Sequence, residues 1–291
     1  MILLLLSLFG CTDQGFAAIE LDAIAVVNGD FDDLGGTLLR HEIGFVPFNG
    51  YISQSTTWVG DEPPTREDPG RTVEQLFTGA VPDQAKFEIE QYNAVFINSG
   101  TRGLNAFRYN YSIETDDDLL LDEQAMTNAC DYIDANGSVF VTDWAYDVVE
   151  RCLPDAIEFL DDDTIVDDAQ AGVAGTVLAD VVDEELATTL GTSVMNVEFN
   201  YSAFAVMEDV GADAEVLLSG DVSYESKEGG VKVVKRAPLI VRIPVGKSGQ
   251  VVYSSFHLFP QTTALADALL FRGIEGLEPG AGDKSEEVAS E

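Results

Sequence analysis

Two side chains able to transfer a proton each follow an apolar run of the sequence. Asp143 comes directly after the run at residues 138–142, and His257 comes shortly after the run at residues 250–254. A histidine near a carboxylate can act as a general base or as a metal ligand. We therefore predict that Asp143 and His257 are the catalytic residues if the chain is an enzyme.

Further polar or aromatic residues occupy similar positions after apolar runs, and we predict that they bind a ligand: Asp30, Asn98, Ser99, Trp144 and Gln261. Asp30, with Asp32 and Asp33, also forms an acidic group that could hold a divalent cation such as Ca²⁺, which prefers carboxylate oxygens. Taken singly, each strand-end Asp or Asn could instead cap the helix that follows it. The sequence indicates no other cofactor.

The elements that position these residues are short apolar runs rich in branched side chains. Residues 23–27, 94–97 and 138–142 are apolar without alternation, which is typical of strands buried on both faces in a parallel sheet. Met126, Ala129 and Ile133 recur at helical spacing between the second and third runs, which predicts a right-handed strand–helix–strand crossover. A second helix is predicted at residues 145–153, where Pro154 stops it. Ligands in such open sheets bind at the carboxyl ends of the strands.

The second half of the sequence has a different pattern, with short apolar runs divided by glycine-containing turns. We predict separate antiparallel strands at residues 216–218, 231–234 and 239–243, divided by glycine-containing turns and leading into the strand at 250–254. Helices are predicted at 183–190 and 262–271. The predicted fold class is therefore α/β, with three layers: a mostly parallel sheet, helices on both faces, and an antiparallel extension in the C-terminal half.

Two segments resemble a known family. Residues 138–146, with the sequence SVFVTDWAY, match its strand-to-helix elbow, and residues 249–257, with the sequence GQVVYSSFH, are similar to its late strand bearing a histidine. On these segments the chain resembles the class I glutamine amidotransferase-like superfamily, including its trehalose-utilisation-type branch, over roughly residues 22–275. The resemblance implies a flavodoxin-like sheet.

The elbow departs from the family in the residue that matters for chemistry. The amidotransferase elbow presents a cysteine nucleophile between glycines, whereas Asp143 stands at that position here, and neither Cys130 nor Cys152 falls at an elbow. Glutaminase activity is therefore not expected. We predict instead a non-catalytic domain that binds a glycan or a divalent cation at the strand ends. Alternatives are an extracellular hydrolase of a carbohydrate or small molecule that uses Asp143 and His257, and a structural or adhesive surface module.

The N-terminus resembles an export signal. Residues 1–11 form an apolar run that is shorter than the ~20 residues of a membrane-spanning helix. It ends in Leu8-Phe9-Gly10-Cys11, which resembles the bacterial lipobox, whose cysteine is acylated and becomes the mature N-terminus. We predict a lipid anchor at Cys11 and, because Thr12 follows, a location in the outer membrane of a bacterium. The alternative is an ordinary signal peptide with an incidental cysteine.

Composition limits the partners of the chain. Its 291 residues include 52 Asp and Glu but 15 Lys and Arg, for a formal charge of −37. A nucleic-acid partner is excluded because binding needs a basic patch, whereas a protein or glycan partner at the cell surface stays open. We predict a tether at residues 12–20, one folded domain at 21–275 and a disordered acidic tail at 276–291. In an exported chain Cys130 and Cys152, on neighbouring predicted helices, could pair or remain buried thiols.

Overall fold

The computed structural model describes residues 24–51, 70–82, 86–101, 123–161, 169–201 and 204–274. The predicted lipobox with Cys11, the tether at 12–20 and the tail at 276–291 lie outside these residues. None of the described helices is long and apolar enough to cross a membrane.

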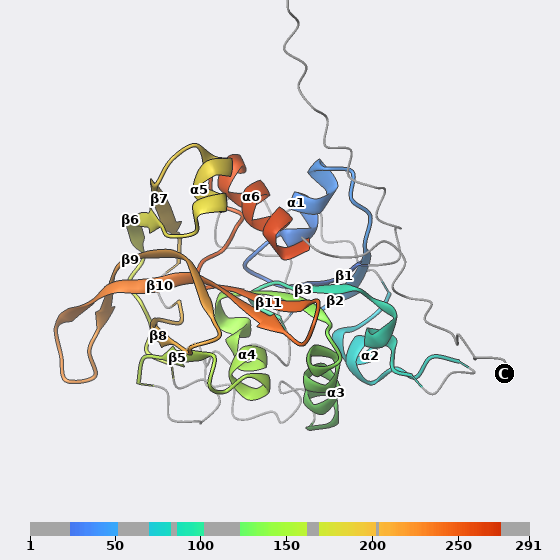
Figure 1. Ribbon diagram of the computed structural model, residues 1–291. Helices are drawn as coiled ribbons and strands as arrows, with labels where there is room; N and C mark the ends of the chain where they lie inside the picture. The colour runs from blue at the N-terminus through green and yellow to red at the C-terminus, as the bar shows by residue number, and fades with distance from the viewer. Residues whose placement is uncertain are drawn as a thin grey trace, which may run out of the picture.

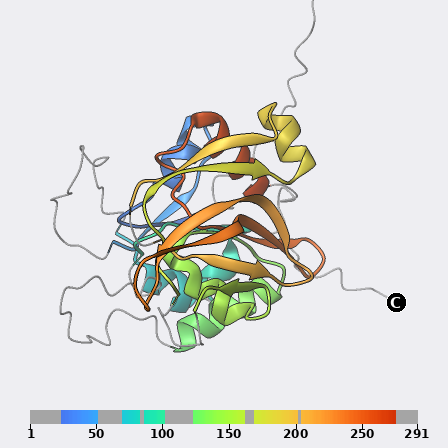
Figure 2. The same ribbon diagram turned by 90° about the vertical axis from the view of Figure 1, so that its left-hand side faces the viewer.

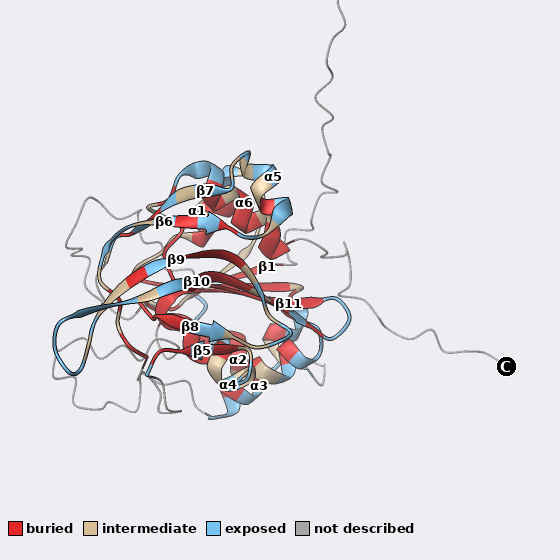
Figure 3. Cartoon of the chain, turned by 60° about the vertical axis from the view of Figure 1, so that its left-hand side comes forward, coloured by how far each residue is buried: buried red, intermediate tan, exposed pale blue. Residues whose placement is uncertain are grey.

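A nine-stranded sheet organises the described residues, in the order β2-β1-β3-β4-β11-β10-β9-β6-β7. One half is parallel, as the continuous apolar runs predict. It contains β1 (Ile24–Asn28), β2 (Val46–Asn49), β3 (Ala94–Ile97), β4 (Ser138–Thr142) and β11 (Gly249–Ser254). Its central strands are buried on both faces (Figure 3), which explains the absence of alternation in their sequences.

The other half of the sheet is antiparallel and lies nearest the viewer in Figure 2. It contains β10 (Val231–Val245), β9 (Glu215–Glu225), β6 (Gly175–Val181) and β7 (Val194–Phe199). The predicted separation of residues 231–234 from 239–243 is wrong. The pairing of β10 with β9 shifts register between Val234 and Ala237, where Arg236 has φ 54°. The strand continues through this irregularity, so both runs belong to β10. A separate two-stranded sheet pairs β5 (Ile157–Phe159) with β8 (Met207–Val210).

Helices cover both faces of the sheet, so the fold has the three layers predicted (Figure 1). On one face lie α1 (Leu34–Arg40), α5 (Glu184–Leu190) and α6 (Thr263–Ile274). On the other lie α2 (Val73–Thr78), α3 (Glu123–Asp134) and α4 (Asp147–Cys152), with the short 3₁₀ helix η1 (Glu88–Gln91). Each interface has its own apolar core: Val95, Val141 and Val251 belong to the α3 side, and Phe96 stacks on Phe140 on the α6 side.

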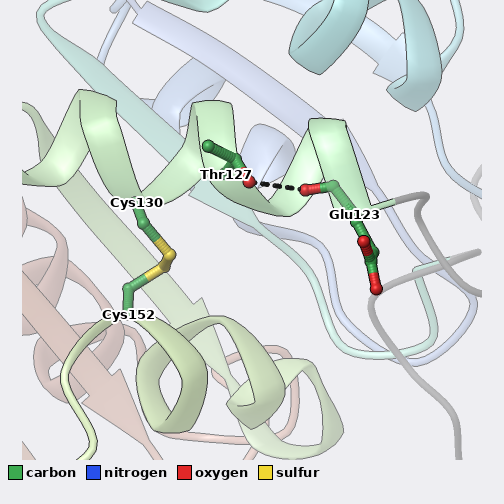
Figure 4. The surroundings of a disulfide bond; sticks show 4 residues. All are labelled: Glu123, Thr127, Cys130 and Cys152. Atoms are coloured by element: carbon green, nitrogen blue, oxygen red, sulfur yellow. Dashed lines mark hydrogen bonds between the residues drawn. A yellow bond between two sulfur atoms is a disulfide. The ribbon is translucent and has the colours of Figure 1, made fainter.

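Cys130 on α3 and Cys152 on α4 are joined by a disulfide (Figure 4). Their Cα atoms lie 4.9 Å apart. The bond fixes α4 against α3, and α4 directly follows the turn that carries Asp143. The disulfide therefore braces the helix layer beneath the predicted elbow.

Candidate functional site

The chain turns sharply where β4 ends. Asp143 is the first residue of the 3₁₀ helix η3 (Asp143–Tyr146), which leads into α4, so the predicted helix at 145–153 is a 3₁₀ turn followed by an α-helix. Asp143 has φ 46°, in the left-handed region that costs a non-glycine residue roughly 1–2 kcal/mol. Its Oδ1 accepts a hydrogen bond from the N–H of Ala205 at 3.2 Å, and its carbonyl oxygen accepts one from the Tyr253 hydroxyl at 3.0 Å. These contacts hold a strained elbow of the kind found at functional sites.

His257 meets Asp143 at this elbow. The Nε2 atom of His257 lies 3.0 Å from Oδ2 of Asp143, and the two side chains are 5% and 4% exposed. The two groups form a close ion pair rather than a well-aligned hydrogen bond. On the other side of the ring, Nδ1 lies 3.0 Å from Oδ1 of Asn200. The structure thus brings the two predicted catalytic residues together, because β4 and β11 are parallel neighbours and end at the same edge.

A second carboxylate lies close to this pair. The side chain of Asp32 accepts hydrogen bonds from the N–H groups of Leu258, at 2.9 Å, and Phe259, at 3.0 Å. These residues directly follow His257, so Asp32 ties the loop after β1 to the loop after β11. Asp32 and His257 also interact by charge. Three titratable side chains, those of Asp32, Asp143 and His257, therefore cluster at the strand ends.

Burial and charge shift the pKa of all three groups. Burial raises the pKa of the Asp143 carboxyl above 3.8, and the contact with His257 offsets part of this rise. Burial likewise raises the pKa of Asp32, against the charge of His257 and the surrounding N–H groups. Burial alone would lower the pKa of His257, but the close contact with the Asp143 carboxylate, with a contribution from the charge of Asp32, raises it above 6.5. The cluster therefore holds its protons more tightly than the unfolded chain does.

The predicted cation site does not assemble. Asp33 caps α1, accepting from the N–H of Gly36 at 2.8 Å, while Asp32 is engaged with Leu258 and Phe259. Asp30 is buried, and its N–H donates to the carbonyl of Gly100 at 3.1 Å. Among the described residues no group of three or more His, Cys, Asp or Glu side chains is placed to hold a metal ion. The turn after β1 therefore gives the carboxylates of Asp32 and Asp33 different partners.

The remaining predicted ligand-binding residues divide into two groups. Gln261 lies beside the site: its Nε2 donates to the carbonyl of His257 at 2.9 Å. Ser99 is buried, and its N–H donates to Oγ1 of Thr142, next to the elbow, at 2.9 Å. Trp144, by contrast, packs into the core on the α3 side.

Asn98 joins β1 to α1 inside the protein. Its Nδ2 donates to the carbonyl of Val27, and its Oδ1 accepts from the N–H of Leu34, both at 2.8 Å. Asn98→Ala would leave the N–H of Leu34 without this acceptor and would remove one of the two hydrogen bonds to the Val27 carbonyl, which keeps the main-chain N–H of residue 98. We therefore expect the free energy of unfolding to fall by about 2 kcal/mol. Urea denaturation measures the loss. Asn196→Ala, on the exposed side of β7, is the control and should change stability by less than about 0.5 kcal/mol. Equal effects of the two substitutions would contradict this role.

Sequence reasoning missed several residues of the site. Asn200 and Tyr201 follow β7, which the sequence analysis did not identify as a strand, so their place at a strand end was not visible. The rings of Phe31 and Tyr201 flank His257, with centroids 6.3 and 5.4 Å from the imidazole. Ala205 contributes a backbone N–H, for which a sequence carries no signal.

Comparisons with known proteins concern the fold. No protein-family model and no curated protein sequence matches the chain. A glutamine amidotransferase structure from Methylobacillus flagellatus aligns with a TM-score of 0.50 at 10% identity, over 93% of this chain and 99% of that one. One from Thermotoga maritima aligns with a TM-score of 0.41 at 11% identity, over 81% and 75%. A ThuA-like protein from Parabacteroides merdae aligns with a TM-score of 0.42 at 12% identity, over 87% and 88%. The fold is thus the flavodoxin-like fold of glutamine amidotransferase-like proteins, which by itself does not specify an activity.

Proposed function

We propose that this chain is a bacterial cell-envelope lipoprotein whose amidotransferase-like domain binds a ligand at the strand ends and does not hydrolyse glutamine. One observation carries the proposal: the elbow holds Asp143 in a buried ion pair with His257, 3.0 Å apart. A carboxylate neutralised by a buried histidine is a weak nucleophile, because its charge and both of its oxygens are already engaged.

The cysteines support the same proposal. Cys130 and Cys152 are bonded to each other between α3 and α4, so neither thiol is free to act at the elbow. The third cysteine of the sequence, Cys11, belongs to the proposed lipid anchor. A domain that keeps the elbow and its histidine but engages both in an ion pair is suited to binding rather than to acyl transfer.

The ligand that we propose is a glycan. Aromatic rings at Phe31 and Tyr201 offer apolar faces beside the polar groups of His257 and Asn200, a mixture that suits the hydroxyl edges and C–H faces of a sugar.

Thermal unfolding tests the binding proposal. The soluble protein starting at Thr12 is heated with a panel of oligosaccharides, and separately with Ca²⁺ or chelator. A ligand at about 100 times its Kd should stabilise the folded state by about 2.7 kcal/mol. Asp143→Asn should abolish the shift, whereas Asn196→Ala should retain it. Ammonia release from glutamine by the wild-type protein would refute the non-glutaminase part of the proposal. No stabilisation by any ligand of the panel would favour a structural or adhesive module.

The anchor is tested separately. Cys11→Ala should abolish incorporation of labelled palmitate and release the protein from the membrane fraction, whereas Ser7→Ala should do neither. We expect the labelled protein to appear in the same membrane fractions as outer-membrane markers. Palmitate incorporation that survives Cys11→Ala would refute the anchor.

A hydrolase is the second candidate, favoured by the φ of 46° at Asp143, because strained residues at a strand-to-helix elbow present nucleophiles in other folds. In this case the protonated His257 would donate a proton as a general acid, while Asp143 holds the imidazole in place. Hydrolysis of a glycan by the wild-type protein, lost in both Asp143→Asn and His257→Gln, would establish it over simple binding.

A further inference from the structure

Asn200 stands between the buried imidazole of His257 and the solvent. Its Oδ1 lies 3.0 Å from Nδ1 of His257. Asn200 is exposed, whereas the His257 side chain is 5% exposed. Because Nε2 of the same ring faces Asp143, Nδ1 is the nitrogen directed toward an exposed group. The carboxamide of Asn200 therefore links the buried imidazole to an exposed residue.

The main chain before Asn200 is held by a neighbouring side chain. Gln261 accepts from the N–H of Glu198 at 3.0 Å and donates to its carbonyl at 2.7 Å, and it also donates to the carbonyl of His257. These three hydrogen bonds hold the end of β7 beside His257. The side chain of Asn200 can thus turn away from the imidazole while Gln261 keeps the backbone in position.

The surroundings of Nδ1 select the chemistry of a group that would replace Asn200. Both ring nitrogens of His257 face oxygen acceptors, Nε2 facing Oδ2 of Asp143 and Nδ1 facing Oδ1 of Asn200, so Nδ1 donates a hydrogen bond and its partner must accept one. The carboxylates of Asp143 and Asp32 lie near the same ring and disfavour an anion. The rings of Phe31 and Tyr201, with centroids 5.6 Å apart, give the position apolar walls.

We propose that the carboxamide of Asn200 is a built-in occupant of the ligand position, and that a ligand binds by displacing it and presenting a neutral oxygen acceptor to Nδ1 of His257. Such an occupant weakens apparent affinity, because the site is open only while Asn200 is turned away. The inference rests on the proposed function, which places a ligand at these strand ends. It adds that Asn200 controls access to Nδ1 of His257, and that the ligand group binding there is uncharged.

Acetamide and acetate are a matched pair of probes for the experiment, since they share shape and differ in charge. Each is titrated into the wild-type protein and Asn200→Ala while the imidazole NMR signals of His257 and the Tm are followed. Acetamide should bind Asn200→Ala about tenfold more tightly than the wild-type protein, because it no longer competes with the internal carboxamide. It should move the His257 signals and raise the Tm. Asn196→Ala should respond as the wild-type protein does.

Three results would overturn the inference: no acetamide effect on Asn200→Ala, an equal effect on Asn196→Ala, or acetate binding as tightly as acetamide. If Asn200→Ala does not fold, Asn200→Ser is titrated in the same way and judged by the same results. The outcome is independent of the natural ligand, so it can fail while the glycan screen succeeds. Conversely, acetamide binding with no response to any glycan would support the role of Asn200 and would refute the proposal that the natural ligand is a glycan.

Discussion

Replacing His257 by glutamine is expected to lower the free energy of unfolding by about 3–5 kcal/mol, as measured by urea denaturation at pH 6. The substitution removes the cationic partner of Asp143 and leaves a carboxylate that is 4% exposed without its opposite charge, with the N–H of Ala205 still donating to it. Losing one member of a buried ion pair costs this much because the other charge stays out of water. The elbow at the end of β4 should loosen as a result.

The other histidine of the chain provides the control. Nε2 of His41 lies 2.9 Å from Oδ1 of Asp267, but the His41 side chain is 29% exposed, so His41→Gln should cost less than about 1 kcal/mol. The double variant Asp143→Asn/His257→Gln should be less destabilised than the sum of the single variants. Additive costs, or equal costs for the two histidines, would show that His257 and Asp143 do not act as a pair.

The same pair makes stability depend on pH. His257 has a pKa above its unfolded value of 6.5, so its contribution is complete below pH 6.5 and is lost as the pH rises through the folded pKa. The carboxyls of Asp143 and Asp32 act in the same direction: their contributions are complete below pH 3.8 and disappear as the pH rises through their raised values. Wild-type stability should therefore fall above pH 6.5, and His257→Gln should flatten that part of the profile. A wild-type profile that rises there would contradict this assignment.

Removing the disulfide is the second large effect expected. Cys130→Ala/Cys152→Ala should lower the free energy of unfolding by about 3 kcal/mol, because the bond closes a loop between residues separated by 22 positions and restricts the unfolded chain. Urea denaturation under oxidising conditions measures the loss.

Dithiothreitol supplies the control for the disulfide. The reduced wild-type protein should match the double variant, and the variant itself should not respond to the reductant. A variant as stable as the oxidised wild-type protein would show that packing of α3 on α4 needs no covalent bond.

The sequence predicted those strands whose two faces are both buried. β1, β3 and β4 are continuous apolar runs because helices cover both of their faces, and such runs end visibly in polar residues. Helix α1 was missed because Gly35 and Gly36 lower helix propensity. Packing explains Gly35, since a Cβ there would lie 3.0 Å from the Phe45 ring. β7, whose exposed side chains include Val194, gives neither a continuous run nor a clear polar alternation.

The candidate site was predicted where its residues follow such strands. Asp143 and His257 could be paired in advance because two parallel strands that end together bring their following residues together. The choice among Asp30, Asp32 and Asp33 could not be made, because it depends on the turn after β1, where Asp33 accepts from the N–H of Gly36 and Asp32 from those of Leu258 and Phe259. Asn200 was invisible because its strand was not identified.

The position of β11 determines when this protein can fold. This strand is the last of the described strands in the chain, yet it lies between β4 and β10 at the centre of the sheet, and it is the strand through which the two halves pair. Until residues 249–254 emerge, the parallel half exposes the open edge of β4 and the antiparallel half exposes that of β10. Pairing so late between segments so distant in the chain makes folding slow and leaves open strand edges for much of synthesis. The native sheet therefore cannot close before β11 has been made.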